Sequence, residues 1–293
     1  MRIFPRGEDH HGWWSNRWLL LLLAGWLLAP AWPAELRVMT FNVRMPSISD
    51  GPDYWEHRKD IAVDMVREQA PDVFGTQELF YSQGEYLSAH LSGYRWFGLS
   101  RRGNHEDEHM GVFYKTARLE LLEQGNYWLS ETPETPGSSS WDMSLPRMVT
   151  WGRFRLKDTG TEFYLLNTHF PHRRQDGRAR VNCAKVIARR IESLPRDVPL
   201  LLVGDFNESA EGSAHKMLAR ELKDAWTVAA ERSGPEGTFH GFGGAPRPDR
   251  IDWILFRAPW KVLRAETVSF HEGERYPSDH FPVWAVFSLD GEH

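Results

Sequence analysis

The sequence has one cysteine, Cys183, in 293 residues, and this excludes an intramolecular disulfide. The fold must therefore rely on its hydrophobic core. No second cysteine or closely spaced histidine pair predicts a zinc site. Cys183 lies in a helix-like pattern with Val186 and Ile187, so we expect a small buried side chain there.

The sequence also lacks a hydrophobic run long enough to cross a bilayer. Its longest apolar run covers residues 18–28, about half of the roughly 20 residues that a membrane-spanning helix needs. Arginines precede this run and Ala29-Pro30-Ala31 follows it, the order of a secretory signal. We predict a signal peptide over residues 1–31, with Ala34 as the second choice of cleavage site. The mature protein is then periplasmic or secreted, without stable membrane insertion; an uncleaved N-terminal anchor is the alternative.

An excess of positive charge is missing as well. The chain has 35 Lys and Arg against 40 Asp and Glu, a net charge of −5, which disfavours tight binding of a long nucleic-acid duplex. The exception is a local basic cluster: His172, Arg173, Arg174, Arg178 and Arg180. With 41% hydrophobic residues, no internal repeat and no linker, the sequence predicts one globular domain over residues 35–290.

The patterns that are present alternate between strand and helix in the first third of the chain and favour strands afterwards. We expect helices over 55–69, near 86–91 and over 175–194. We expect strands over 36–43, 72–78, 94–99, 110–114, 119–129, 147–156, 163–170, 200–203, 251–256, 262–268 and 281–289. This order favours an α/β protein with a mixed sheet layered by helices over a barrel.

One long loop stands out between these elements. Residues 130–146 are rich in Ser, Thr, Pro and Gly, with Trp141 embedded among them. Ordered loops of this length are more often functional than connective, so we expect a functional role for this one.

The stretch with the clearest functional pattern is 199–207. Its apolar residues 200–203 are typical of a strand buried on both faces, and Gly204 then precedes Asp205 and Asn207. If the backbone stays extended, both polar side chains point to the same side of the sheet. The alternative is an ordinary strand-to-helix turn that caps a helix opened by Glu211.

Other polar residues also stand at the ends of predicted strands. Carboxylates and amides without thiolates suit a hard cation, Mg²⁺ first and Mn²⁺ or Ca²⁺ next, and such an ion implies a phosphate-ester substrate. Each residue has an ordinary alternative: His169 a core histidine, Asn42 a turn residue, Asp252 a surface partner of Arg250. The full set is Asn42, Glu78, His169, Asp205, Asn207, Asp252, Asp279 and His280.

Six short motifs containing these residues occur in the order seen in the endonuclease/exonuclease/phosphatase superfamily, which the chain resembles from residue 36 to residue 289. The superfamily includes deoxyribonuclease-like nucleases, abasic-site endonucleases, neutral sphingomyelinases, inositol polyphosphate 5-phosphatases and deadenylases. Residues 128–141 further resemble a poorly characterised, often exported bacterial branch. The motifs are Thr40-Phe41-Asn42-Val43, Gln77-Glu78, Asn167-Thr168-His169, Gly204-Asp205-Phe206-Asn207, Arg250-Ile251-Asp252 and Ser278-Asp279-His280.

The resemblance implies a four-layer α/β sandwich, in which two mixed β-sheets pack face to face with helices outside. It implies that Glu78 binds the metal directly, with Asn42 beside it and Asp279 in the metal shell. His280 would act as a base or contact the phosphate. Because adjacent side chains diverge in an extended segment, the carboxylate that orients His280 is expected to be Asp252 rather than Asp279.

The remaining roles concern the reacting groups. Asp205 would activate the attacking water or protonate the leaving oxygen, Asn207 would hold Asp205 or the phosphate, and His169 would stabilise charge on the phosphoryl oxygens. Arg147, Arg58 and His172 are candidates for substrate binding, and ordinary ion pairs or a solvated helix face are their alternatives.

Together these features predict a Mg²⁺-dependent hydrolase that cleaves a phosphate ester by in-line attack of water. A phosphodiesterase with nuclease-like chemistry is the first expectation, acting on a small molecule or nucleic acid. A phosphomonoesterase for an inositol or sugar phosphate is the alternative. A metal-binding module that has lost catalysis belongs to a second class, and no protein partner is implied.

Overall fold

The computed structural model describes residues 34–289, so the predicted signal peptide over residues 1–31 and its first-choice cleavage site lie outside the described part. Within the described part, no helix is both long and apolar enough to span a bilayer. The helices are η1 (Ile48–Asp53), α1 (Trp55–Gln69), α2 (Tyr81–His90), η2 (Arg174–Asp176), α3 (Gly177–Glu192), α4 (Ser213–Leu218) and α5 (Ala225–Val228). The helix expected near 86–91 thus lies at Tyr81–His90, about one turn earlier.

The strands form two mixed sheets. The first has seven strands in the order β10-β12-β13-β1-β2-β4-β3, and the second has six in the order β5-β6-β7-β8-β11-β9. The first sheet consists of β1 (Glu35–Asn42), β2 (Val73–Gln77), β3 (Tyr94–Phe97), β4 (Val112–Lys115), β10 (Glu231–Ser233), β12 (Lys261–Thr267) and β13 (Val283–Ser288). The second consists of β5 (Leu119–Trp128), β6 (Met148–Leu156), β7 (Glu162–His169), β8 (Leu200–Asp205), β9 (Lys223–Asp224) and β11 (Asp252–Arg257).

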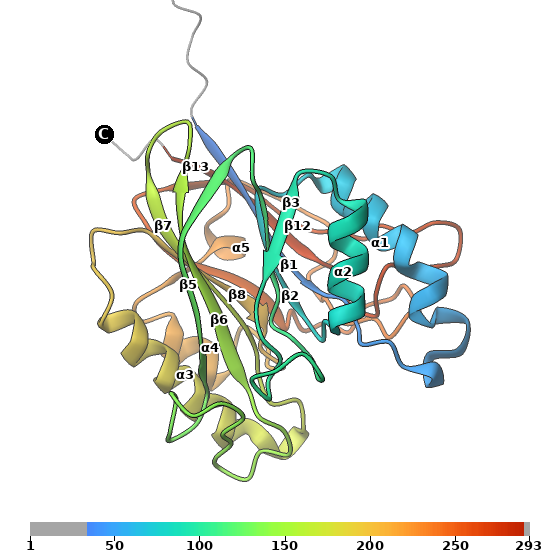
Figure 1. The fold of residues 1–293 in the computed structure, drawn as a ribbon, viewed down its shortest axis with the longest axis horizontal. Coiled ribbons are helices and arrows are strands. Elements are labelled where there is room, and N and C mark those ends of the chain that lie inside the picture. Colours follow the sequence, from blue (N-terminus) through green and yellow to red (C-terminus); the bar gives the residue numbers. More distant parts are fainter. Residues whose placement is uncertain (1–33, 290–293) are drawn as a thin grey trace, which may run out of the picture. The chain divides into compact units, whose positions relative to one another are not determined.

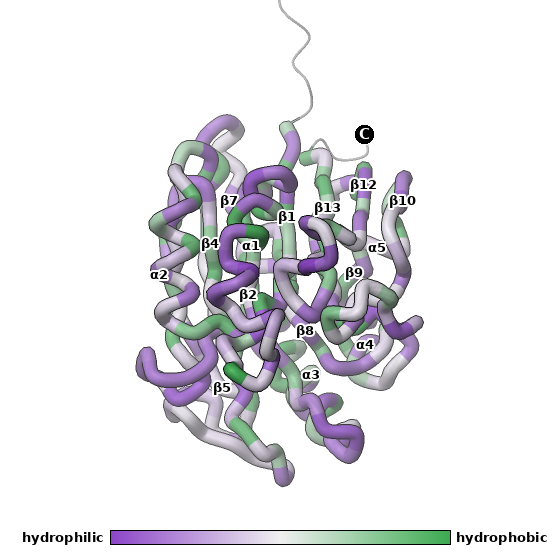
Figure 2. The backbone as a smooth tube through the Cα atoms, turned by 90° about the vertical axis from the view of Figure 1, so that its right-hand side faces the viewer, coloured by the Kyte–Doolittle hydropathy of each residue, from purple (hydrophilic) through white to green (hydrophobic). Residues whose placement is uncertain are grey.

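The three largest hydrophobic clusters of the described residues fill the spaces between four layers of helices and sheets, and this confirms the predicted sandwich (Figure 1). The central cluster joins the two sheets, with Val38, Val73, Leu201 and Ile254 among its members. A second cluster lies between β7, β8 and β11 and the helices α3 and α4; Cys183 belongs to it and is buried, as the sequence predicts. The third lies between the first sheet and α1 and α2. Figure 2 shows hydrophobic residues along the strands and mostly hydrophilic residues in the outer turns.

The topology explains why the polar residues of the motifs meet. β1 runs parallel to β2, and β7 runs parallel to β8, so each pair ends at one edge of its sheet. The two sheets face each other with β1 and β2 against β7, β8 and β11. β11 is antiparallel to β8 and begins where β8 ends, so Asp252 stands opposite Asp205. The same edge of both sheets therefore presents the ends of five strands.

Candidate active site

Asp205 lies at the centre of the polar residues at this edge. It is the last residue of β8 and pairs in register with His169 on one side and Asp252 on the other. Its Oδ2 accepts a hydrogen bond from Asn42 Nδ2 at 3.0 Å, and its Oδ1 accepts one from the backbone N–H of Asn207 at 2.9 Å. Burial, together with the nearby carboxylate of Asp252, raises the pKa of Asp205 to about 7. A buried carboxyl group with such a pKa can exchange protons at neutral pH.

Two histidines flank the Asp205 carboxylate. His280 Nδ1 is 2.9 Å from Asp252 Oδ2, and its Nε2 is 3.8 Å from Asp205 Oδ2. The contact with Asp252 confirms the predicted partner of His280. Although burial alone would lower it, the carboxylates of Asp252 and Asp205 raise the pKa of His280 to about 10. His280 is thus an imidazolium at neutral pH.

His169 is the second of these histidines, and its ring is neutral, whereas that of His280 is charged. Its Nε2 lies 3.4 Å from Asp205 Oδ2, and its Nδ1 lies 3.9 Å from Glu108 Oε2. Burial and the positive charge of Arg147 keep its pKa well below the usual value, so the ring is neutral. Because its buried Nδ1 has no hydrogen-bond partner among the described residues, His169 is not the satisfied core histidine of the alternative interpretation.

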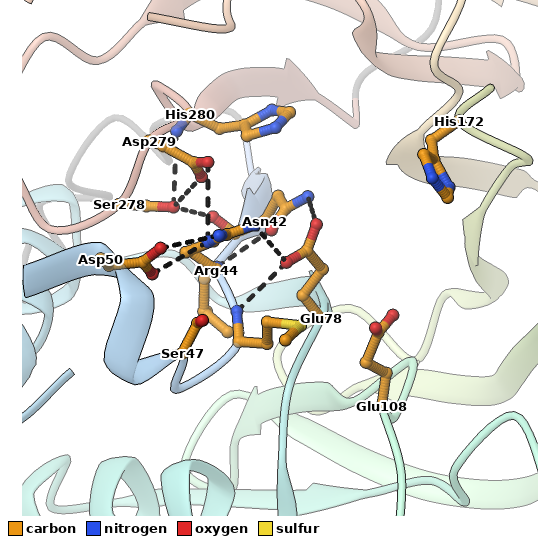
Figure 3. A network of polar contacts seen from close by, with 12 residues as sticks. Asn42, Arg44, Ser47, Asp50, Glu78, Glu108, His172, Ser278, Asp279 and His280 are labelled. Carbon is orange, nitrogen blue, oxygen red and sulfur yellow. Dashed lines mark hydrogen bonds and ion pairs between the residues drawn. The ribbon is translucent and has the colours of Figure 1, made fainter. Parts of the chain in front are cut away.

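The carboxylates predicted to bind a metal lie beside this group and face a common positive charge (Figure 3). Arg44 places Nη1 3.7 Å from Glu78 Oε2 and Nε 3.8 Å from Asp279 Oδ2, while Asp50 holds the same guanidinium at 2.7 Å. A cation is therefore already accommodated between Glu78 and Asp279. Two carboxylates that share one cation position, without sulfur donors, fit a hard ion such as Mg²⁺.

Asn42 lies beside Glu78, as the resemblance implies. Its Nδ2 donates to Glu78 Oε1 at 3.3 Å and to Asp205 Oδ2, and its Oδ1 accepts from the backbone N–H of Arg44 at 3.0 Å. Since the amide presents its donor to both carboxylates, Asn42 orients Glu78 and Asp205, and a role in the metal shell stays a prediction.

Asp205, Asp252 and His280 form a second group compact enough to hold an ion, with ligand atoms within 4.8 Å of one another. A metal bound there would have to displace the proton of His280, whose pKa these carboxylates raise. The direct hydrogen bond between His280 Nδ1 and Asp252 Oδ2 leaves one further ligand atom on each residue, His280 Nε2 and Asp252 Oδ1. Because His280 is protonated, we take Glu78 and Asp279 as the candidate cation site and this second group as the alternative.

These residues line a cleft of about 1130 Å³, and several cationic side chains surround it. Arg147 is 3% exposed and its Nη1 has no hydrogen-bond partner among the described residues, while its Nη2 is 3.1 Å from His172 Nδ1. Of the basic cluster noted in the sequence, His172 and Arg174 line the cleft, whereas Arg173 pairs with Asp176. Arg147 and His172 thus lie where a substrate phosphate could reach them.

Arg58 does not lie where substrate binding would require it. Its side chain is 1% exposed, and its guanidinium donates to the backbone carbonyls of Asp53, Val43, Arg44 and Pro277 at 2.7 to 2.9 Å. These acceptors lie at the end of η1 and in two loops, after β1 and before Asp279, that adjoin site residues. Arg58 therefore has a structural role, and the expectation of phosphate binding is replaced by one of loop anchoring.

Replacing Arg58 by alanine is expected to lower the free energy of unfolding by at least about 3 kcal/mol, because several buried carbonyls lose their donor. Urea unfolding followed by circular dichroism measures this loss. Arg67 lies on the same helix and is exposed, so Arg67→Ala is the matched control and should change stability by less than about 1 kcal/mol. Equal stabilities of the two variants would contradict the anchoring role.

Asn207 also differs from the expectation. The strand ends at Asp205, and Asn207 adopts a left-handed backbone with φ 50°, so the two side chains do not follow from an extended segment. Asn207 Nδ2 donates to the carbonyl of Phe170 at 3.1 Å, and the residue lines the cleft. The following helix begins at Ser213, two residues after Glu211, and Asp205 does not cap it.

Sequence reasoning missed several residues of the cleft, among them the charged residues Arg44, Arg101, Glu108 and Arg247. Arg101 Nη1 is 2.8 Å from Glu108 Oε2, and both side chains are buried; the two residues belong to the loop that connects β3 to β4. Their loop has no strand-end pattern that would have drawn attention to them. Arg44 had a signal, since it follows the Asn42 motif by two residues.

Comparison with known proteins places this geometry in a wider group. The profile of the Endonuclease/Exonuclease/phosphatase family matches residues 39–280. A solved protein of that family from Bacteroides thetaiotaomicron is 34% identical, with a TM-score of 0.84 over 88% of this chain and 99% of its own. A mannosyl-6-phosphatase from the same organism is also 34% identical, with a TM-score of 0.81 over 86% of this chain and 99% of its own.

More distant relatives are similar to this chain in sequence or in fold. Nocturnin of Drosophila melanogaster is 24% identical over 89% of this chain, and the match covers 48% of nocturnin. This chain thus spans about half the length of the curated relatives it matches. The human nocturnin catalytic domain, 21% identical with a TM-score of 0.69 over 87% of this chain and 93% of its own, shares the fold.

Proposed function

The chain belongs to the Endonuclease/Exonuclease/phosphatase family, and we propose on this premise that it is a divalent-metal-dependent phosphoesterase that hydrolyses phosphate monoesters of sugars. Hydrolysis of a phosphate ester is the reaction common to the family, while the monoester and the sugar are our proposal. It places a phosphomonoesterase ahead of the phosphodiesterase favoured by the sequence alone.

The observation that carries the choice of a monoester is the set of cations around the cleft. Arg147, Arg174 and Arg247 line it without a carboxylate partner among the described residues, whereas the charge of His280 is paired with Asp252. A phosphate monoester carries about −1.5 to −2 charges at pH 7, whereas a diester carries one. More unpaired cations therefore favour the more highly charged ester. The 34% identical mannosyl-6-phosphatase is, by its name, a phosphatase, and this supports the proposed reaction.

The site residues divide the chemistry of hydrolysis between them. Asp205, with a pKa of about 7, accepts the proton of a water that attacks phosphorus. The imidazolium of His280, held by Asp252, donates a hydrogen bond to a phosphoryl oxygen that becomes more negative in the transition state. Arg147 and the neutral His169 position the remaining oxygens. Glu78 and Asp279 would hold the divalent ion, which supplies charge neutralisation at the phosphate when bound.

Phosphodiester hydrolysis is the second candidate, because the cleft of about 1130 Å³ exceeds the upper end of the usual range for small-ligand pockets, roughly 1,000 Å³. The chain's net charge of −5 argues against long nucleic acids as the substrate of such an activity. Export through the predicted signal peptide at residues 1–31, a single catalytic domain over 35–290 and Mg²⁺ as the ion are further parts of the proposal.

The experiment that tests the choice compares p-nitrophenyl phosphate with bis(p-nitrophenyl) phosphate in the presence of Mg²⁺. We expect kcat/KM for the monoester to exceed that for the diester by at least about tenfold, corresponding to about 1.4 kcal/mol of additional transition-state binding. A preference for the diester would move phosphodiesterase to first place. Hydrolysis of neither compound, with metal binding intact, would favour a module without catalysis.

A further inference from the structure

A second concave site lies outside the catalytic cleft, between α3 and the long loop at 130–146. It has a volume of about 530 Å³, within the range of small-ligand sites. One wall is a single face of α3, formed by residues at helical spacing: Asn182, Lys185, Val186 and Arg189. The opposite wall is the loop, with Trp141 and Glu134 among its residues. We call this site the α3 groove.

Hydrogen bonds within the loop at 130–146 hold its conformation at the α3 groove. Ser130 Oγ is 2.7 Å from Ser138 Oγ, and Ser140 Oγ accepts from the backbone N–H of Glu131 at 3.1 Å. Trp141 and Asp142 both have left-handed backbones, with φ 57° and 60°, and Arg173 donates to the carbonyl of Asp142. Non-glycine residues adopt this conformation only where the surroundings hold them, so the loop fixes the place of Trp141.

The groove also offers polar groups that the described part of the protein leaves unused. Tyr127 is 1% exposed and lines the groove, and its hydroxyl has no hydrogen-bond partner among the described residues. Arg190 covers the Tyr127 ring at 5.3 Å and lies 3.5 Å from Glu134. Arg189 is exposed and has no carboxylate within ion-pair distance among the residues described. A buried hydroxyl without a partner is uncommon and points to a ligand that would supply one.

The mixture of groups indicates the chemistry of that ligand. A tryptophan offers a flat apolar surface with a negative face, which suits the polarised C–H groups of a sugar ring. An amide, two carboxylates and basic side chains offer both acceptors and donors for hydroxyl groups of a neutral ligand. Charges of both signs alternate around the groove, with Glu131 and Glu134 facing three basic side chains, and this mixture suits the hydroxyl groups of a sugar better than the concentrated charge of a nucleotide. A hexopyranose is therefore the class that the groove fits best.

The position of the groove along the chain connects it with the catalytic cleft. Trp141 lines the groove and Leu145 lines the cleft, and these residues are separated by four steps of the chain, at most about 14 Å. An oligosaccharide of a few rings bridges such a distance. We propose that the α3 groove binds a hexopyranose ring of an oligosaccharide whose phosphorylated ring occupies the catalytic cleft. The oligosaccharide substrate rests on the proposed function, whereas the sugar-binding groove does not.

The kinetic test compares mannose 6-phosphate with mannotriose that carries one 6-phosphate on its terminal ring. We expect the wild type to favour the trisaccharide in kcat/KM by at least about tenfold. Trp141→Ala and Arg189→Ala should remove most of this preference and leave turnover of mannose 6-phosphate unchanged. Arg178 is an exposed arginine of the same helix outside the groove, so Arg178→Ala is the matched control and should keep the preference. Equal kcat/KM values for both substrates in the wild type, or a preference retained by Trp141→Ala and Arg189→Ala, would overturn the proposal.

A binding experiment separates this proposal from the proposed function. Saturation-transfer NMR with unphosphorylated mannotriose should show contact with the wild type and with Arg178→Ala, and a loss of contact in Trp141→Ala and Arg189→Ala. If this pattern holds while neither phosphate is hydrolysed, the groove stands and the phosphatase proposal falls. If the phosphates are hydrolysed but mannotriose does not bind, or adenosine monophosphate binds at the groove in its place, the sugar assignment is overturned.

Discussion

Replacing Asp205 by asparagine is expected to lower kcat for a phosphate ester by about 10²- to 10⁴-fold, the usual contribution of a positioned general base. Asparagine keeps the shape, and its single oxygen can still accept the hydrogen bond that Asp205 Oδ1 receives from the backbone N–H of Asn207, while the bond that Oδ2 receives from Asn42 is lost. It cannot take a proton from water at neutral pH. Phosphate release under saturating substrate and Mg²⁺ measures the effect.

The same substitution should leave the fold intact. Because burial raises the pKa of Asp205, the structure does not depend on its charged form, and a neutral amide avoids that burial cost. Asp197 lies exposed in the loop between α3 and β8, so Asp197→Asn is the control that should keep full activity. Turnover retained by Asp205→Asn within a factor of about three, well short of the usual effect, would contradict its role.

Replacing Glu78 by glutamine is expected to weaken Mg²⁺ binding by at least about tenfold and to reduce turnover in parallel at limiting Mg²⁺. The reason is that a ligand carboxylate loses its charge while keeping its shape. Glu78 accepts from Asn42 Nδ2 through Oε1 and from the backbone N–H of Met45 through Oε2, and glutamine can keep one of these two hydrogen bonds through its single oxygen. Isothermal titration with Mg²⁺ measures the affinity.

Glu68→Gln is the control for Glu78→Gln, since Glu68 is an exposed residue of α1. Its Mg²⁺ affinity should equal that of the wild type. If Glu78→Gln binds Mg²⁺ as tightly as the wild type, and a variant of Asp205 or Asp252 binds it more weakly, the ion belongs at the group of Asp205, Asp252 and His280.

Much of the fold could be predicted because local pattern and tertiary structure agree. The apolar run at 200–203 is buried on both sides in β8, between the central cluster and α3, as such runs usually are. The strand-end residues meet because parallel strands end at the same edge, which the order of strands and helices already favours.

The parts that could not be predicted depend on contacts between distant segments. Nothing near Arg58 in the sequence indicates that Pro277, in a loop far along the chain, will accept its hydrogen bond. Asn207 leaves the extended conformation because its backbone N–H donates to Asp205 Oδ1 instead of to a neighbouring strand. Asparagine adopts the resulting left-handed backbone more easily than most residues. Glu108 lies near His169 only because the two sheets pack against each other.

Dependence of turnover on a divalent ion held by Glu78 is the central claim, and a Mg²⁺ titration of phosphate release by the wild type and Glu78→Gln tests it most directly. The wild type should lose activity in excess chelator and regain it with Mg²⁺, while Glu78→Gln should need at least about ten times more Mg²⁺ for half of its maximal rate. Full activity of the wild type in excess chelator, or identical titration curves for both proteins, would contradict the account.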